Sequence, residues 1–305
     1  MSPGAPSCVW SAWKPCEDRL GIRLSDATLL CATMLTKPAS PDSWNAMWRY
    51  RHLLWQFTKR QIEGRHKGSL LGFGWSILNP LLMLVIYTFV FSVIFPGHFS
   101  NRPGDGPIVY AFTIFLGLSF YHLFVDSFAP APALIVTNPN FVKKVVFPLE
   151  ILPAATVGAA VFHFLVILVL FFTGAFIAGI PIAWTALWLP AVILPMIMMS
   201  LGVCWLLAAL GVFLRDLQQL VTFAALVLMW ASAIFFSPSR IPPAVWQFLK
   251  FNPLLQIIDV ARKTVFWGEP PTARVMLFIY LFAVISMVTG FWIFRKTRPA
   301  FADVL

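Results

Sequence analysis

The residue types that carry most enzyme chemistry are present in this chain, but their spacing fits none of the common catalytic or nucleotide-binding motifs. "GRHKGS" at 64–69 combines glycine with basic residues, yet its order differs from the GxxxxGK[ST] loop that cradles phosphates. The sequence contains no HExxH, CxxC or GxSxG motif. We therefore expect a chain that does not hydrolyse ATP by itself and holds no metal or other cofactor.

Histidine, cysteine and acidic side chains are scattered along the sequence. The four cysteines, which lack metal-ligand spacing, are Cys8, Cys16, Cys31 and Cys204. His163 lies in an apolar run, where a hydrogen bond between helices is expected more often than a metal ligand. Asp126 and the Arg215–Asp216 pair lie near the ends of apolar runs. No polar relay of the kind that ion-driven carriers need at mid-depth of the membrane is therefore predicted.

Aromatic side chains are concentrated in the apolar segments. Sugar rings stack on aromatic faces through their C–H groups, so an aromatic-lined conduit could pass a glycan without holding it by charge. Aromatic residues in membrane helices also face lipid or neighbouring helices, and residue type alone leaves both interpretations open. The candidate conduit-lining residues are Trp75, Tyr87, Phe91, Phe112, Phe115, Tyr121, Trp230, Phe235 and Phe236.

The composition is typical of an integral membrane protein. Of the 305 residues, 59% are hydrophobic and 11% are charged, whereas soluble domains have about 25% charged residues. The formal net charge of +10 would also suit nucleic-acid binding. The collection of lysine and arginine on the cytoplasmic side of a membrane explains it better, so no nucleic-acid partner is expected.

Six apolar segments are long enough to cross about 30 Å of hydrocarbon. The predicted spans are residues 70–95, 108–130, 150–179, 184–212, 217–236 and 274–294. The predicted fold class is therefore an all-α integral membrane protein with six transmembrane helices. Residues 65–296 would form its membrane domain, with a poorly ordered tail at 1–43 and a cytoplasmic tail at 297–305.

Residues 44–64 predict an amphipathic helix before the first span. This helix either lies in the headgroup layer or packs on its own subunit. Alternating aromatic and basic residues favour the headgroup layer, where rings enter lipid and cations approach phosphates. The residues that indicate this interfacial position are Trp48, Arg51, Trp55, Lys59, Arg60 and, directly after the helix, Arg65.

The distribution of lysine and arginine predicts the orientation of the spans. The amphipathic helix, Lys143 with Lys144, Arg215 and the residues after the last span all fall on one face. We therefore expect both termini in the cytoplasm and the chain in the cytoplasmic (inner) membrane. Residues 237–273 would then lie outside, although they carry several basic residues that count against this assignment.

The same external segment is too long for a turn and too apolar for a solvated loop. It predicts two short helices, at about 243–251 and 254–267, separated by Asn252-Pro253. Neither is long enough to span. The pair either enters the membrane part-way and returns, or rests on the outer surface as an amphipathic hairpin, and the re-entrant form is favoured.

Four blocks of sequence resemble, in the same order, the membrane subunits of type-2 ABC exporters for polysaccharides. These are permeases for O-antigen, capsule and polyol-phosphate chains, and the resemblance extends from about residue 48 to residue 295. The blocks are "LLWQFTKRQIEGRHKGSLLGFGWSILNPLLMLVIYTFVFSVIF" (53–95), "FVKKVVFPLEILP" (141–153), "GVFLRDLQQLV" (211–221) and "FFSPSRIPPAVWQFLKFNPLLQIIDVAR" (235–262).

The resemblance implies a homodimer with two copies of a separate ABC ATPase subunit on its cytoplasmic face, which would bind ATP and magnesium. It also implies a short coupling helix between the second and third spans that docks into the ATPase. The implied coupling residues are Phe141, Lys143, Lys144, Val146, Phe147 and Glu150. The external helix pair resembles the outer gate of the family, with Trp246, Phe248, Asn252 and Pro253 as candidate gate residues.

The predicted function is therefore that of a transport subunit, in contact with membrane lipids, which exports a lipid-linked polysaccharide. An exporter of drugs or small lipids is an alternative in the same fold, although such permeases lack this set of blocks. A membrane-embedded glycan-processing enzyme would need carboxylates or arginines gathered at the membrane face. Only isolated acids occur in the sequence, so we do not expect an enzyme.

Overall fold

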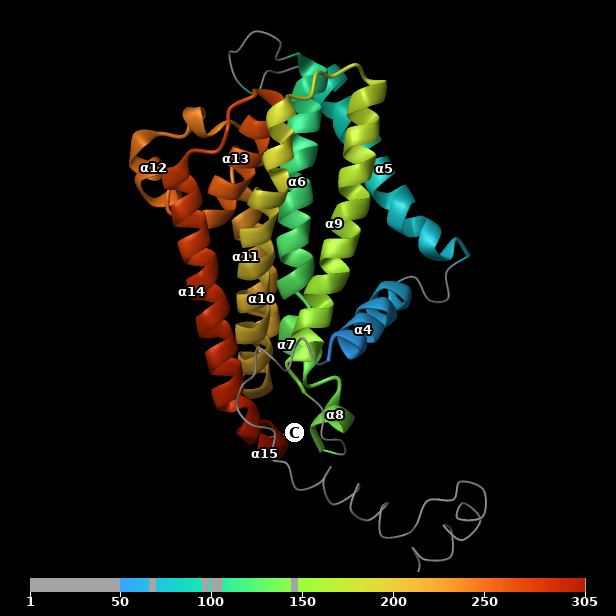
Figure 1. The fold of residues 1–305 in the computed structure, drawn as a ribbon, viewed down its shortest axis with the longest axis vertical. Coiled ribbons are helices and arrows are strands. Elements are labelled where there is room, and N and C mark those ends of the chain that lie inside the picture. Colours follow the sequence, from blue (N-terminus) through green and yellow to red (C-terminus); the bar gives the residue numbers. More distant parts are fainter. Residues whose placement is uncertain (1–49, 66–69, 95–98, 100–105, 144–147, 305) are drawn as a thin grey trace, which may run out of the picture. The chain divides into compact units, whose positions relative to one another are not determined.

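Long helices run side by side and form a bundle (Figure 1). Its two ends are called the α8 end and the α12 end, after the short helices α8 (Pro139–Lys143) and α12 (Pro243–Leu249) that lie there. The computed structural model describes residues 50–65, 70–94, 99, 106–143 and 148–304. Within these ranges every regular element is helical. The predicted tail at 1–43 and Trp48 lie outside the described residues.

The chain forms a succession of long and short helices. In order along the sequence, the remaining elements are α4 (Arg51–Gly64), η1 (Gly72–Gly74), α5 (Trp75–Phe89) with its π-helical continuation η2 (Val90–Ile94), α6 (Pro107–Phe128), α7 (Ala131–Leu134), α9 (Ile151–Ile177), η3 (Trp184–Trp188), α10 (Leu189–Phe213), α11 (Leu217–Ala231), η4 (Pro238–Arg240), α13 (Pro253–Phe266), α14 (Ala273–Thr297), η5 (Arg298–Ala300) and α15 (Phe301–Val304).

Five helical segments among the described residues are long and apolar enough to cross a membrane. They are Trp75–Ile94, Pro107–Leu134, Ile151–Ile177, Trp184–Phe213 and Ala273–Ala300. These segments agree with an all-helical, multi-pass membrane fold. The predicted span 217–236 forms α11, which has 15 residues and is about 22 Å long at 1.5 Å per residue. That is less than the hydrocarbon thickness, so the count of six spans stays a prediction.

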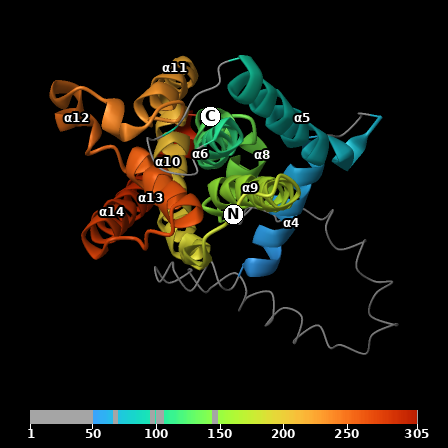
Figure 2. The same cartoon turned by 90° about the horizontal axis from the view of Figure 1, so that it is seen from above.

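Helix α6 is the centre of the bundle. Side chains on every side of it are buried, including Ile114, Leu116 and Phe120, each 0% exposed. Seen from above, α6 lies between α9 and α10, while α5 lies at the margin of the bundle (Figure 2). In the most apolar 18-residue stretch of the α5 span, 0% of the residues are buried, compared with 72% in the span that contains α6. The subunit therefore has a tightly packed part around α6 and a loosely attached helix α5.

Glycine allows α10 and α14 to pack at backbone contact. A Cβ atom at Gly290 would overlap the backbone of Gly202, and one at Gly202 would overlap the backbone of Ser286. Small residues at such crossings are common in membrane helices, where packing replaces the hydrophobic effect as the driving force. A Cβ at Gly211 would likewise overlap the Pro132 backbone, which brings α10 against α7.

Helix α4 packs along α9 near the α8 end. The side chain of Gln61 donates a hydrogen bond of 3.1 Å to the Thr156 hydroxyl, and a Cβ at Gly158 would meet the Thr58 hydroxyl at 2.9 Å. Trp55, one turn before Thr58 on α4, has an exposed fraction of 63%. An exposed tryptophan on a helix with a buried face fits the interfacial position, which stays a prediction.

The C-terminal segment packs back onto the bundle, although the sequence suggests only a tail at 297–305. Phe301 in α15 is 0% exposed, with ring centroids 5.5 Å from Phe294 and 6.1 Å from Phe213. One buried aromatic ring is enough to hold this short segment against α10 and α14.

Gly290→Ala should destabilise the protein, because the added methyl group overlaps the α10 backbone, which cannot move aside as a side chain can. We expect a loss of about 1–3 kcal/mol in the free energy of unfolding, measured as a lower thermal midpoint of the purified protein. Gly64→Ala is the control, since nothing lies within 4 Å of a Cβ at that position. Equal midpoints for the two variants would contradict the close crossing.

Candidate functional site

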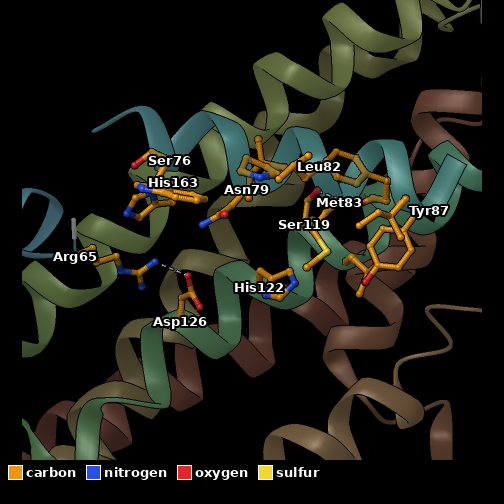
Figure 3. Close-up of a pocket in the computed structure, with 16 residues that line it drawn as sticks. Arg65, Ser76, Asn79, Leu82, Met83, Tyr87, Ser119, His122, Asp126 and His163 are labelled. Carbon is orange, nitrogen blue, oxygen red and sulfur yellow. Dashed lines mark hydrogen bonds and ion pairs between the residues drawn. The ribbon is translucent and has the colours of Figure 1, made fainter. Parts of the chain in front are cut away.

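A cavity of about 570 Å³ lies between α5, α6 and α9 (Figure 3). Its volume is within the range of about 300–1,000 Å³ that is typical of small-molecule sites. The lining residues are Arg65, Trp75, Ser76, Asn79, Pro80, Leu82, Met83, Ile86, Tyr87, Phe115, Leu118, Ser119, His122, Asp126, His163 and Ile167. They belong to three helices and to the residue directly after α4.

Helical periodicity brings the polar lining residues together. On α6, Ser119, His122 and Asp126 follow one another at spacings of three and four residues, which places them on one face. Helix α5 contributes Asn79, and α9 contributes His163. Asn79 and His122 are exposed within the subunit, so their polar groups are accessible from the cavity.

An ion pair lies at one end of the cavity. The Arg65 guanidinium donates to the Asp126 carboxylate across 2.8 Å, with 39% and 32% of the two side chains exposed. It joins the residue after α4 to the last turn of α6 (Figure 3). A pair with this exposure stabilises the fold by only about 0–1 kcal/mol, so its value is in positioning the two segments.

The opposite end of the cavity is apolar. Tyr87, Met83 and Leu82 of α5 lie there, away from the Arg65–Asp126 pair (Figure 3). The cavity is therefore amphipathic along its length, with charged groups and Trp75 toward one end and Tyr87 with aliphatic groups at the other. Sequence analysis treats Asp126 and His163 as isolated residues. The repeat of Ser119, His122 and Asp126 on α6 is the signal that could have predicted this cluster.

Three of the candidate conduit residues, Trp75, Tyr87 and Phe115, line this cavity. Two others are buried in the subunit core. Phe112 packs against Phe171 at 5.9 Å between ring centroids, and the Tyr121 hydroxyl donates to the Ala225 carbonyl at 2.9 Å. The single subunit thus gives those two rings a packing role, and a conduit role for them stays a prediction.

A second group of candidates forms an aromatic cluster toward the α12 end. Phe91 lies 6.3 Å from Tyr87, 5.4 Å from Tyr110 and 6.4 Å from Phe235 between ring centroids. Trp230 of α11 lies 5.4 Å from Phe235 and is 56% exposed. Phe236, the next residue, is half-buried. The cluster joins α5, α6 and the end of α11.

Arg262 of α13 is the most deeply buried charged residue among those described, with 1% of its surface exposed. Its Nε donates to the Thr113 carbonyl at 3.0 Å, and its Nη atoms donate to the carbonyls of Ala233 at 2.9 Å and Ile234 at 2.6 Å. The guanidinium also lies 4.6 Å from the centre of the Phe99 ring. These contacts attach α13 to α6 and to the end of α11.

The backbone around Arg262 is adapted to it. Ala233 has a φ of 50°, so the chain leaves the helical conformation directly after α11. A Cβ at Gly117 would overlap the guanidinium, so glycine is required there. Arg262 is one of the basic residues of 237–273 that count against an external position. As a buried structural group, it says nothing about the side of the membrane.

Helices α12 and α13 lie where the two short external helices are predicted. Asn252 caps α13, because its side chain accepts from the Leu254 N–H at 3.0 Å and donates to the Ala231 carbonyl at 3.1 Å. Pro253 is the first residue of α13, a position that needs no N–H. Trp246 is half-buried and Phe248 is 79% exposed. The re-entrant position and the gating role stay predictions.

The predicted coupling segment contains the short helix α8. Phe141 of α8 contacts Phe57 of α4 edge to face at 5.5 Å, and α15 lies beside α8. Lys144, Val146, Phe147 and the side chain of Lys143 are outside the described residues.

Glu150 is engaged within the subunit. Its carboxylate accepts a hydrogen bond from Arg298 at 2.8 Å, and its backbone carbonyl accepts from the Trp205 indole at 3.1 Å. With 9% of its surface exposed, Glu150 links the start of α9 to the C-terminal segment. A direct contact of this residue with an ATPase stays a prediction.

Apolar helices packed around α6 define a multi-pass membrane protein. A family model described as "ABC-2 type transporter" matches residues 52–266, which is more than half of the 305 residues. The chain belongs to the ABC-2 type transporter family. In the described part of the chain, no group of three or more His, Cys, Asp or Glu side chains is arranged to hold a metal ion.

Curated relatives align over most of the chain. The O-antigen export system permease protein RfbA of Klebsiella pneumoniae is 26% identical over 256 residues, covering 83% of this chain and 95% of that protein. The RfbA protein of Myxococcus xanthus is 26% identical over 259 residues, or 84% and 96% of the two chains. The polysialic acid transport protein KpsM of Escherichia coli is 22% identical over 253 residues, or 79% and 92%.

Arg262 and Gly117 should be energetically coupled. Arg262→Ala leaves three buried carbonyls without their charged donor, so we expect a loss of about 3 kcal/mol or more. Gly117→Ala should cost about 1–3 kcal/mol in the presence of Arg262, because the methyl group overlaps the guanidinium, and much less once Arg262 is alanine.

Thermal midpoints of the two single variants and the double variant measure this coupling. Arg274→Ala, which removes an exposed arginine from α14, is the control and should change little. Additive effects of Gly117→Ala and Arg262→Ala would show that the two residues do not meet as described.

Proposed function

We propose that this chain is the transmembrane subunit of an ATP-driven exporter that moves a lipid-linked polysaccharide across the cytoplasmic membrane. The observation that carries the proposal is the alignment, over nearly the whole of both chains, with permeases named for O-antigen export. Membership of the ABC-2 type transporter family supplies the transport class and implies an ABC ATPase partner. The absence of a phosphate loop from the sequence agrees with a separate ATPase.

The proposed ATPase site is the α8 end of the subunit. Helix α8 contacts α4 through the Phe141–Phe57 pair and lies beside α15. Movement of α8 would therefore reach α4 directly, and through the Arg65–Asp126 ion pair it would reach α6. The route is a chain of direct contacts, and a mutation in α8 tests it.

The orientation follows from the charges at the two ends. Arg60, Arg65, Arg295 and Arg298 belong to segments at the α8 end, and Lys143 adds to them by sequence. Basic residues collect on the cytoplasmic side. We therefore assign the α8 end and both termini to the cytoplasm, and the α12 end to the outside.

A second copy of the chain is proposed to pack on the loosely covered side of the bundle. Large apolar side chains of α5 and α11 are exposed in the single subunit, including Val85, Phe89, Phe223 and Trp230 at 57%, 55%, 66% and 56%. The aromatic cluster around Phe91 lies next to these helices. In a homodimer its rings would line the path of the glycan, stacking on sugars without holding them by charge.

The outer gate is proposed to be α12 alone. Helix α13 is attached to α6 by the buried Arg262, whereas no residue of α12 is buried. Segments with few buried contacts open at the lowest cost in free energy. Phe248, at 79% exposure, is the large apolar residue of α12 most accessible to a passing glycan or to a second copy.

Export itself is testable in cells that carry this chain and its ATPase. Replacing the phosphate-loop lysine of the ATPase should leave the glycan inside the cytoplasmic membrane, because the permease has no nucleotide site. Surface staining with a glycan-specific lectin or antibody, with and without permeabilisation, measures the change. Unaltered surface glycan in these cells would refute the proposed function.

The coupling role of α8 is testable with Phe141→Ala. This variant should lower glycan export at least tenfold, because α8 loses its contact with α4. Phe176→Ala is the matched control, since Phe176 is 85% exposed near the other end of α9. Co-purification of the ATPase distinguishes loss of coupling from loss of assembly. Normal export by Phe141→Ala would contradict the coupling assignment.

A further inference from the structure

We propose that the cavity between α5, α6 and α9 binds a neutral sugar unit of the exported glycan, as a site within the subunit and separate from the aromatic path between copies. This inference rests on the proposed function. Its physical basis is the combination of a neutral charge balance, polar groups from all three helices and aromatic surface in one half-open cavity.

The charge balance of the cavity selects a neutral ligand. Its lining contains one cation and one carboxylate, and these two groups already pair with each other at 2.8 Å. A phosphate in the cavity would be repelled by the Asp126 carboxylate, and the Arg65 guanidinium that could bind it is already paired. A cation would be repelled by the guanidinium, and the carboxylate that could bind it is likewise paired. A partly enclosed charge without its own counter-charge costs free energy. A polyhydroxylated neutral ring avoids both costs.

The hydrogen-bonding groups suit hydroxyls that both donate and accept. The Asp126 carboxylate accepts, the Asn79 amide offers a donor and an acceptor, and the neutral imidazole of His122 likewise has one of each. His163 approaches from α9, so polar atoms converge on the cavity from three sides (Figure 3). A purely aliphatic lipid tail would leave this end of the cavity without partners.

The aromatic groups suit the apolar face of a sugar ring. Tyr87 of α5 lines the apolar end of the cavity, and Trp75, twelve residues earlier on α5, lines it next to Ser76. Phe115 of α6, which is 4% exposed, forms part of the wall. A volume of about 570 Å³ is that of a small-ligand site and is too small to hold many sugar units at once. The site therefore takes one or a few sugar units, such as the end of the chain or the units next to its lipid.

The test uses the complete complex of this chain with its ATPase in lipid nanodiscs. The first probe is a neutral oligosaccharide of the exported glycan, freed of the lipid pyrophosphate by mild acid. The second probe is inorganic pyrophosphate, which represents the head of a lipid carrier without sugar. Saturation-transfer NMR with titration measures both affinities, including weak ones.

The matched variants remove polar groups inside and outside the cavity. Asn79→Leu should weaken oligosaccharide binding by about tenfold, through loss of the hydrogen bonds of one side chain. Asp126→Asn should weaken it similarly while keeping the side-chain shape. Thr173→Val is the control, because Thr173 is an exposed polar residue of α9 that does not line the cavity. The complex with this variant should bind the oligosaccharide with the same affinity as the wild type.

Weaker oligosaccharide binding by Asn79→Leu and Asp126→Asn, with little binding of pyrophosphate, would support the sugar site. Unchanged oligosaccharide binding in both variants would overturn it, as would tight pyrophosphate binding that these variants abolish. Should Asn79→Leu fail to assemble with the ATPase, His122→Phe replaces it with the same expectation. Surface glycan in wild-type cells is scored in parallel. If the variants overturn the sugar site but wild-type cells export glycan normally, the proposed function still stands. Glycan export that does not depend on the ATPase would instead refute the proposed function.

Discussion

A buried arginine organises the half of this subunit at the α12 end. The guanidinium of Arg262 lies away from solvent, where an unsatisfied charge is costly, and it is satisfied by three backbone carbonyls of α6 and of the turn after α11. Those bonds are possible only because Gly117 has no side chain and the backbone turns at Ala233. The same interaction holds α13 against α6 and against the turn after α11, whereas α12 has no buried residue.

The subunit combines a close-packed part with a loosely packed part, and the candidate sites lie in the second. Glycine contacts such as Gly202 with Gly290 bring α10 and α14 together at backbone distance. Helix α5 instead attaches to α6 and α9 around a cavity, with the Arg65–Asp126 pair at one end and Tyr87 toward the other. A transporter needs both, because a rigid frame can transmit movement only to a part that is free to move.

The sequence predicts the helices well and the site poorly, for related physical reasons. Apolar runs long enough to cross lipid predict α6, α9, α10 and α14 nearly to their ends, because an exposed backbone in hydrocarbon must form helix. The predicted span at 217–236 extends beyond α11, because the backbone turns at Ala233, whose carbonyl accepts a hydrogen bond from Arg262, 29 residues further along the chain. Among the aromatic candidates, Phe112 and Tyr121 prove to be core residues of the subunit, a distinction that residue type does not carry.

By itself, the sequence determined the membrane class, the family resemblance and the break at Asn252-Pro253, because hydropathy, block order and proline chemistry are local properties of the chain. Only the tertiary structure decided that Asn79, His122, Asp126 and His163 share one cavity. These residues come from three helices that are far apart in sequence, so their meeting depends on how α5 packs against α6 and α9. The role of Arg262 was decided in the same way, since a cation in an apolar segment acquires its partners only when distant helices are brought together.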